Sequence, residues 1–314
     1  MRILILGAGA IGAYFGARLQ QAGGDVTFLV RPGRMAVLRE RGLTVSSPFG
    51  NVHFAPQLVI RQDLREHFDL VILSCKAYDL ASAMADIAPA VGKHSLVLPL
   101  LNGVRHIDLL AARFASAQVL GGIAQAALRV TPGGEIEHFN KVHRLIAGTL
   151  DHQPSPELQQ LAKLLQASGV EFIVADDVEQ AMWNKFVFWS ALAGATCTLR
   201  ANIGEVLRTV GGQAFIAGLL GECAEVAQAG GHALSESQLA TCRNQLSEPD
   251  SVLAASMLRD IERGSATEAE HTLGDLVSRA GSFGLASPCL RLAHSHLQAY
   301  ELRRQAAASA SLLT

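Results

Sequence analysis

The sequence predicts an α/β domain built on a parallel sheet, followed by an all-helical domain, and three observations support this prediction. Short runs of branched aliphatic residues alternate with helical patterns over the first 175 residues. A glycine-rich turn joins the first of these runs to the first helix. After Asp176 and Asp177 only helical patterns remain. We therefore expect two domains, residues 1–175 and residues 176–314.

The N-terminal segment carries the clearest motif. An apolar strand, Arg2–Leu6, leads into Gly7, Gly9 and Gly12, which have G-x-G-x-x-G spacing, and a helix follows. Gly7 permits a tight turn, Gly9 lets a pyrophosphate approach the backbone, and Gly12 lets the helix pack closely on the strand. This context favours a dinucleotide-binding turn over a chance match, and the apolar run is too short for a secretory signal. The first domain is thus predicted to be of the Rossmann type.

The end of the second predicted strand indicates which dinucleotide binds. Val26–Val30 is followed by Arg31, Gly33 and Arg34, with no acidic residue. An acid in this place accepts from the ribose 2′-hydroxyl of NAD, whereas an arginine fork matches a phosphate dianion. We therefore expect Arg31 and Arg34 to bind the 2′-phosphate of NADP. Ordinary charges on a solvated loop are the competing interpretation.

Polar residues also follow two later strands. Lys76 comes just after the strand expected at 70–73, and Asn102 just after the strand expected at 96–101. Each residue alone is compatible with ordinary turn chemistry. Ligands of open α/β sheets bind at the carboxyl ends of the strands, so two such residues beside a nucleotide motif predict a site.

The remaining elements follow from polarity patterns. Alternating segments between residues 121 and 148 flank Pro132-Gly133-Gly134 and predict antiparallel strands that close the sheet. A last short strand is expected at 171–174, and the alanine- and serine-rich tail 305–314 is expected to fray. Helices are expected at 79–91, 154–167, 178–199, 213–228, 236–246, 251–262, 268–282 and 288–304.

Composition excludes several classes of function. Of the 314 residues, 49% are hydrophobic and 17% charged, and the net charge of −2 gives no electrostatic case for a nucleic acid or an anionic membrane. The most apolar segment, 186–197, is too short to span a bilayer. The five cysteines are scattered without a C-x-x-C pair, which argues against a disulfide framework and against a metal site. We expect a cytoplasmic protein, because cysteines stay reduced there.

A lysine stands out in the first helix of the second domain. Lys185 is the only charged residue between Ala181 and Leu199. Burial would lower its pKa and make its proton more available, and a carboxylate partner would hold it charged. The alternative is that its stem packs on the helix while the ammonium reaches solvent. Glu268 is a candidate partner; it could equally complement the dipole of a helix that it begins, with Thr267 as N-cap.

These motifs together resemble the ketopantoate reductase (2-dehydropantoate 2-reductase) family over nearly the whole chain. The matching segments are G-A-G-A-I-G at 7–12, C-K-A at 75–77, L-N-G at 101–103, W-N-K-F at 183–186, I-G-E at 203–205, and S-M-L-R-D-I-E-R-G-S-A-T-E at 256–268. The first is common to many dehydrogenases. The lysine helix followed by the serine-to-glutamate segment is much more specific.

The resemblance implies NADPH-dependent reduction of a small 2-oxo acid, by default ketopantoate to pantoate in pantothenate synthesis. It implies that Lys185 is the general acid and that Glu268 orients it. Asn102 would lie beside the nicotinamide and the substrate, and Ser256 would bind the substrate carboxylate. The cofactor-binding residues it implies are Gly7, Gly9, Ala10, Ile11, Gly12, Arg31, Arg34, Lys76 and Asn102.

The chain departs from the family pattern near the lysine. Trp189 and Ala193 stand where family members usually carry asparagine, and Val252–Ala255 lacks an asparagine found in some members. We expect Trp189 to contact the substrate, either selecting a more hydrophobic 2-oxo acid or reshaping the pocket for ketopantoate. A non-catalytic NADP-binding regulator and a β-hydroxyacid dehydrogenase are the alternatives, and Trp189 disfavours the second. The oligomeric state is left open, a homodimer being one option.

Overall fold

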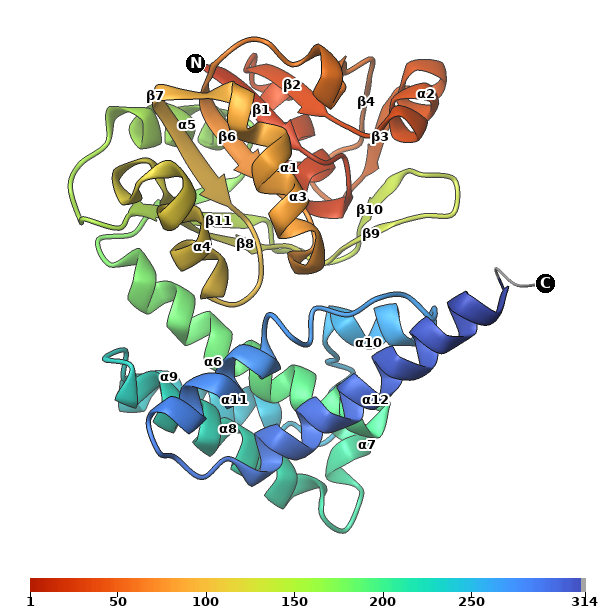
Figure 1. Cartoon of the computed structure of the whole chain (residues 1–314), viewed down its shortest axis with the longest axis vertical. Helices are drawn as coiled ribbons and strands as arrows, with labels where there is room; N and C mark the ends of the chain where they lie inside the picture. Colours follow the sequence, from red (N-terminus) through yellow and green to blue (C-terminus); the bar gives the residue numbers. More distant parts are fainter. Residues whose placement is uncertain (312–314) are drawn as a thin grey trace. The chain divides into compact units, whose positions relative to one another are not determined.

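The computed structural model describes residues 1–311, which form two compact units (Figure 1). One unit comprises Met1–Asn102 and His106–Glu179, and the other comprises Gly103–Arg105 and the chain from Gln180 onward. The predicted fold class, an α/β unit with a parallel sheet and a helical C-terminal unit, is confirmed. Within residues 1–311, no helix is both long and apolar enough to cross a membrane.

The first unit is organised around a five-stranded parallel sheet with the order β5-β2-β1-β6-β7. Its strands are β1 (Arg2–Leu6), β2 (Asp25–Leu29), β5 (Gln57–Val59), β6 (Phe68–Leu73) and β7 (Val91–Pro99). Central strand residues are buried, as expected for a sheet covered on both faces. The associated helices are α1 (Ala10–Gln21), α2 (Pro32–Arg41), α3 (Leu80–Ile87) and α4 (Arg105–Phe114).

The helix expected at 79–91 is shorter than predicted. Regular α-helix covers only α3, and 3₁₀ turns at Ala77–Asp79 and Ala88–Ala90 flank it. Pro89 explains the early end, because proline lacks the N–H that would continue the α-helical ladder. The chain then enters β7 directly, so this strand begins five residues earlier than the predicted residue 96.

The strands after residue 120 form two additional sheets, and the prediction that they close the parallel sheet holds only at one point. An isolated parallel bridge joins Val97 of β7 to Val119, the residue just before β8 (Leu120–Gln125). One three-stranded sheet consists of β8, β11 (Arg144–Thr149) and β12 (Glu171–Val174). Helix α5 (Pro156–Ala167) contacts β12. β9 (Leu128–Val130) and β10 (Ile136–His138) join β3 (Leu43–Ser46) and β4 (Val52–Phe54) in a four-stranded sheet. The predicted antiparallel pairing is present within each sheet, between β8 and β11 and between β9 and β10.

The second unit is built from helices α6 to α12. They are α6 (Val178–Leu199), α7 (Ile203–Leu207), α8 (Gly212–Ala229), α9 (Glu236–Leu246), α10 (Ser256–Glu262), α11 (Leu273–Ser282) and α12 (Pro288–Ser311). α8 contacts α7, α9, α11 and α12. Gly194 lets α6 approach α8, because a Cβ there would lie 3.0 Å from two methyl carbons of Leu219.

The short helix α7 was not predicted, and three boundaries in this unit differ from the prediction by more than one residue. α10 begins at Ser256 and not at 251, and α11 begins at Leu273 and not at 268. The tail does not fray at residue 305, since α12 continues to Ser311. Residues 312–314, the end of the tail expected to fray, lie outside the described part of the chain.

Candidate active site

The glycine-rich turn between β1 and α1 is tightly constrained at two positions. Gly7 has a φ of +92°, in the left-handed region, and its N–H donates to the carbonyl of Leu29 at 2.9 Å. A Cβ on Gly12 would collide with the side chain of Ser74 and with the carbonyl of Gly7. The predicted tight turn and close helix–strand packing are therefore confirmed.

The same turn leaves donors available for an anion. A Cβ built on Gly9 would have no described atom within 4 Å, so the backbone there is accessible. Gly9 is the N-cap of the twelve-residue α1 and makes no side-chain cap. The N–H groups of Ala10, Ile11 and Gly12 precede the first intrahelical bond, from Ala13 to Gly9 at 2.9 Å. These donors and the positive helix end suit a pyrophosphate group.

Arg31 and Arg34 follow β2 as predicted but have different surroundings. Arg31 is the N-cap of α2, its side chain is 79% exposed, and it pairs with Asp79 at 3.2 Å. Arg34 donates from Nη2 to the carbonyls of Gly134 at 2.9 Å and Ala8 at 3.3 Å, and burial lowers its pKa. Arg31 therefore presents a guanidinium to solvent, whereas Arg34 is bonded to the backbone of the glycine-rich turn.

Lys76 and Asn102 leave the same edge of the parallel sheet. β6 and β7 are adjacent parallel strands that pair Leu73 with Pro99, and the Leu100 N–H donates to the Leu73 carbonyl at 2.8 Å. Lys76 and Asn102 each follow within three residues of these strand ends, and both are half-buried. Their placement at the carboxyl edge of the sheet is confirmed.

In the helical unit, Lys185 and Glu268 interact electrostatically. Lys185 lies within α6 between the buried residues Trp183 and Phe186, and Glu268 is 5% exposed. Burial lowers the pKa of Lys185 from 10.5 to about 8, and the negative charge of Glu268 partly opposes this shift. Lys185 is thus a cation with a readily released proton, held near a buried carboxylate.

Glu268 is positioned by a turn and not by a helix start. The N–H and hydroxyl of Thr267 both donate to Oε1 of Glu301, at 2.7 and 2.8 Å. The Glu268 carbonyl accepts from the N–H and the hydroxyl of Thr272, at 3.1 and 2.8 Å. The prediction that Thr267 caps a helix beginning at Glu268 is wrong, because α11 begins five residues later and its N-cap is Thr272.

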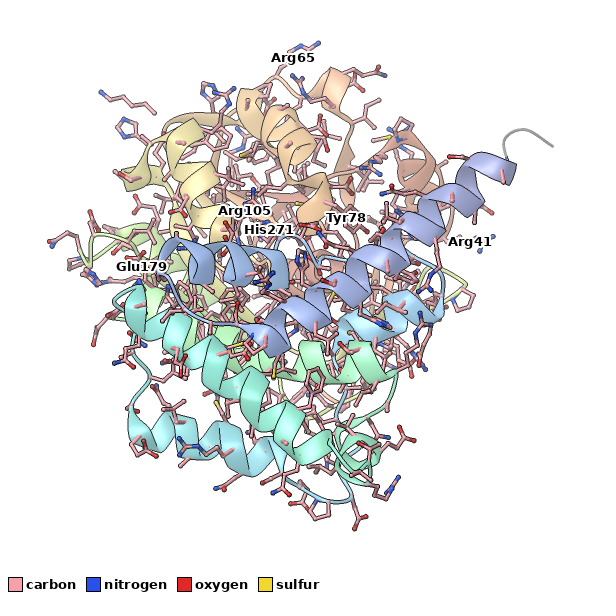
Figure 2. The ribbon with its side chains drawn as sticks, turned by 60° about the horizontal axis from the view of Figure 1, so that its bottom comes forward. Arg41, Arg65, Tyr78, Arg105, Glu179 and His271 are labelled. Atoms are coloured by element: carbon pink, nitrogen blue, oxygen red, sulfur yellow. The ribbon has the colours of Figure 1, made fainter. Side chains whose placement is uncertain are left out.

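The residue after Asn102 packs beside Phe186 and His271. Gly103 has a φ of +84°, and a Cβ on it would lie 3.4 Å from the His271 carbonyl and 3.6 Å from the Phe186 ring. Figure 2 shows Arg105 close to His271, both of them in the helical unit. Burial, with a smaller contribution from the charge of Arg105, lowers the pKa of His271 to about 4, although Asp275 opposes it. His271 is therefore a neutral imidazole at neutral pH.

Trp189 lies one helical turn after Lys185, and their spacing places both on one face of α6. Trp189 is half-buried, and Ala193 on the next turn is fully buried. Ser256 is the half-buried first residue of α10, whose N-cap Ala255 donates to the hydroxyl of Thr196 at 3.3 Å. The start of α10 is thereby tied to the same helix that carries the lysine.

Two residues of these surroundings were not anticipated from sequence. His271 lies three positions after Glu268, but only its burial makes it a neutral neighbour of the Gly103 turn. Asp79 pairs with Arg31 across 48 positions, and no local pattern indicates such a pair. Among residues 1–311, no group of histidine, cysteine and acidic side chains could hold a metal ion.

Comparison with family models identifies both halves of the chain. Residues 3–152 match the model described as ketopantoate reductase PanE/ApbA, and residues 177–301 match its C-terminal model. An uncharacterized oxidoreductase, YkpB of Bacillus subtilis, is 34% identical over 97% of this chain and 100% of its own. The 2-dehydropantoate 2-reductase of Archaeoglobus fulgidus is 29% identical over 90% of this chain and 92% of its own.

Solved structures share the fold over almost the full length. A PanE/ApbA family ketopantoate reductase from Ralstonia eutropha superposes with a TM-score of 0.88 at 26% identity, covering 97% of this chain and 100% of the other. D-mandelate dehydrogenase, solved with NADH and anilino(oxo)acetate, has a TM-score of 0.87 at 24% identity, with the same coverage. The second likeness is evidence of the fold alone. The chain belongs to the ketopantoate reductase family, whose members are pyridine-nucleotide-dependent oxidoreductases acting on a CH–OH group.

Proposed function

We propose that this protein reduces a 2-oxo acid to the 2-hydroxy acid with NADPH, and that ketopantoate is its preferred substrate. The observation that carries the proposal is Lys185, whose pKa is lowered to about 8 by burial and whose charge is supported by Glu268. A general acid works best when its pKa lies near the working pH. The curated 2-dehydropantoate 2-reductases among the relatives support ketopantoate as the substrate.

The reaction assigns each group a simple task. Bound NADPH supplies a hydride to the carbonyl carbon of the substrate. The carbonyl oxygen gains negative charge as this bond forms, and Lys185 stabilises the charge and donates a proton to that oxygen. Glu268 keeps Lys185 charged and oriented between turnovers. The products are the hydroxy acid and NADP⁺, and the neutral lysine takes its proton back from solvent.

The remaining residues are proposed as binding groups. Asn102 would bind the nicotinamide end and the substrate, Lys76 would bind the cofactor, and Ser256 would donate to the substrate carboxylate. Residues 1–175 would therefore serve as the cofactor domain and residues 176–314 as the catalytic domain. The glycine-rich turn supports this division, because its free N–H groups fit a pyrophosphate.

NADP is favoured over NAD by the exposed arginine after β2. The guanidinium of Arg31 is accessible and can donate two hydrogen bonds to a phosphate, and no acid stands at the strand end to accept from a ribose hydroxyl. We assign Arg31 to the 2′-phosphate. Arg34, which we also expected there, supports the site by holding the carbonyl of Ala8 within the glycine-rich turn.

A second candidate substrate is an aryl or otherwise more hydrophobic 2-oxo acid. Trp189 and Ala193 give an apolar character to the helix face that carries Lys185. A structural relative, D-mandelate dehydrogenase, was solved with NADH and anilino(oxo)acetate, an aryl-bearing oxo acid. Replacement of Trp189 by asparagine should therefore raise kcat/KM for ketopantoate relative to phenylglyoxylate.

The cysteines support a cytoplasmic location. Within residues 1–311 no disulfide joins them, and burial raises the pKa of Cys197 to about 12. A thiol of this kind is unreactive and packs as a small apolar residue. Cysteines that form no disulfide are suited to a reducing compartment.

The test is kinetic. Purified full-length protein is given NADPH or NADH together with ketopantoate, phenylglyoxylate and unbranched 2-oxo acids, and loss of reduced nicotinamide absorbance is followed. Lys185→Met should abolish turnover while leaving NADPH binding intact, and Arg243→Met, on the exposed surface of α9, serves as the control. No NADPH oxidation with any acid would refute the proposal, as would full activity of Lys185→Met.

A further inference from the structure

A hollow of about 700 Å³ lies along the last turns of α12, within the helical unit. It is lined by Arg200, Arg303 and Arg304, together with Tyr300 and two alanines of α12. Its volume is in the range typical of small-molecule sites, about 300–1,000 Å³. None of these residues has a role in the reaction proposed above.

Helix geometry explains why these side chains converge. His296, Tyr300, Arg303 and Ala307 have spacings of four, three and four, which place them on one face of α12. Arg200 approaches this face from the C-terminal end of α6, and its guanidinium carbon lies 5.7 Å from the Tyr300 ring centroid. Arg200 has a φ of +51°, the left-handed conformation that glycine usually provides after a helix.

The positive charge in the hollow is only partly neutralised. Arg304 pairs with Glu301 at 2.9 Å, and Glu301 also accepts from Thr267. Over the described chain, residues 1–311, no ion pair joins Arg200 or Arg303 to an acidic side chain. Asp260 is the other nearby acid, and it acts electrostatically on Tyr300. Two guanidinium groups therefore face the hollow without a carboxylate.

The positive charge around the hollow also affects the side chain of His296. Its pKa is lowered by burial and by the charges of Arg200 and Arg303. Its buried Nε2 atom has no hydrogen-bond partner within the described residues. His296 does not line the hollow itself, so it indicates the positive field around Arg200 and Arg303 and is not assigned a contact with the ligand.

We propose that this hollow binds a phosphorylated small molecule. Arg200 and Arg303 would hold the phosphate, because planar guanidinium forks match its oxygens better than a lysine does. The Tyr300 ring and the alanines of α12 would contact the organic part. The site is independent of the proposed reductase activity, since it uses neither the glycine-rich turn nor the lysine of α6.

The test uses the full-length protein and three probes. Phenyl phosphate carries both features of the expected ligand, inorganic phosphate carries only the anion, and phenol carries only the ring. Isothermal titration should give the tightest binding for phenyl phosphate, weaker binding for phosphate, and the weakest for phenol. Equal binding of phenol and phenyl phosphate would overturn the proposal, as would no binding of phenyl phosphate.

Two variants locate the binding. Arg200→Gly removes a guanidinium while keeping a residue that accepts the left-handed backbone, and Arg303→Gln keeps a good helix former. Each should weaken phenyl phosphate binding about tenfold, the usual effect of one lost charged hydrogen bond. Arg243→Gln, on α9, is the control and should leave binding unchanged. Unchanged binding in both hollow variants would refute the site.

A measurement on the natural protein, without substitutions, tests the proposal if a variant does not fold. Arginine-directed modification with p-hydroxyphenylglyoxal, read by peptide mass spectrometry, should be slowed at Arg200 and Arg303 by phenyl phosphate and should not be slowed at Arg243. Equal protection at all three positions, or protection at none, would contradict the proposal.

Discussion

Replacement of Lys185 by methionine should change the stability of the helical unit in a pH-dependent way. Methionine has a similar length and no charge. The pKa of Lys185 is about 8 in the folded protein against an ordinary 10.5, so burial disfavours its charged form. Each pKa unit corresponds to about 1.4 kcal/mol, and at pH 7 the charged lysine therefore destabilises the fold by about 3 kcal/mol.

The sign follows from proton binding. Between pH 8 and pH 10.5 the unfolded chain holds a proton on this lysine that the folded chain has lost. The free energy of unfolding of the natural protein therefore rises with pH in this range. At pH 10 only about 1 kcal/mol of the cost remains. The advantage of Lys185→Met over the natural protein should accordingly fall by about 2 to 3 kcal/mol between pH 7 and pH 10.

The assay is urea unfolding followed by tryptophan fluorescence. Both tryptophans of the chain, Trp183 and Trp189, lie on α6, so the signal reports on the unit that contains the lysine. Comparing the two pH values cancels every effect of the substitution that does not titrate in this range. Arg243→Met, which removes an exposed charge, is the control and should show no such trend. A pH-independent difference, or one that grows with pH, would refute the reasoning.

Three further predictions concern activity and the cofactor site. The kcat/KM for the oxo acid should fall above about pH 8, where the lysine of α6 loses its proton. Glu268→Gln should move this fall to lower pH. An unchanged pH profile of kcat/KM in Glu268→Gln would contradict the electrostatic role of Glu268. Arg31→Ala should raise KM for NADPH by about tenfold or more and should change KM for NADH little. Arg34→Ala should raise KM for both cofactors. Steady-state kinetics with each cofactor distinguish the two patterns. Gly12→Ala should lower Tm and abolish cofactor binding, because a Cβ has no space there. Gly33→Ala should retain the Tm and cofactor binding, because its Cβ would meet no described atom within 4 Å. Similar behaviour of the two variants would refute the packing argument.

The first unit shows which parts of a fold local sequence can predict. β1, β6 and the helix α1 were recoverable because a buried apolar strand, a turn glycine and a helix repeat are signals within a few residues. The strands after residue 120 were found but assigned to the wrong sheet. Alternation indicates that one face of a strand is buried, but it does not identify the neighbour, and here β10 pairs with the distant β3.

In the candidate site, too, local features could be predicted from the sequence and long-range contacts could not. Lys185 could be singled out because it is a lone charge in an apolar helix. The carboxylate that acts on it, Glu268, lies about 80 positions away, and no local pattern specifies such a pair. Glu268 was chosen as a candidate partner and acts electrostatically on Lys185. The local structure expected for it was wrong, since residues 269–272 form a turn and α11 begins only at Leu273. The roles of these residues in catalysis stay predictions.

The chain passes between its two units more than once, and this limits how the protein can be recombined. Gly103–Arg105 belongs with the helical unit although about one hundred residues precede it and the α/β unit resumes at His106. A hybrid enzyme that joins the α/β part of one homologue to the helices of another at residue 176 would therefore combine a foreign tripeptide with Phe186 and His271. Chimeras should work better when residues 103–105 are exchanged together with the helices, because this tripeptide groups with the helical unit.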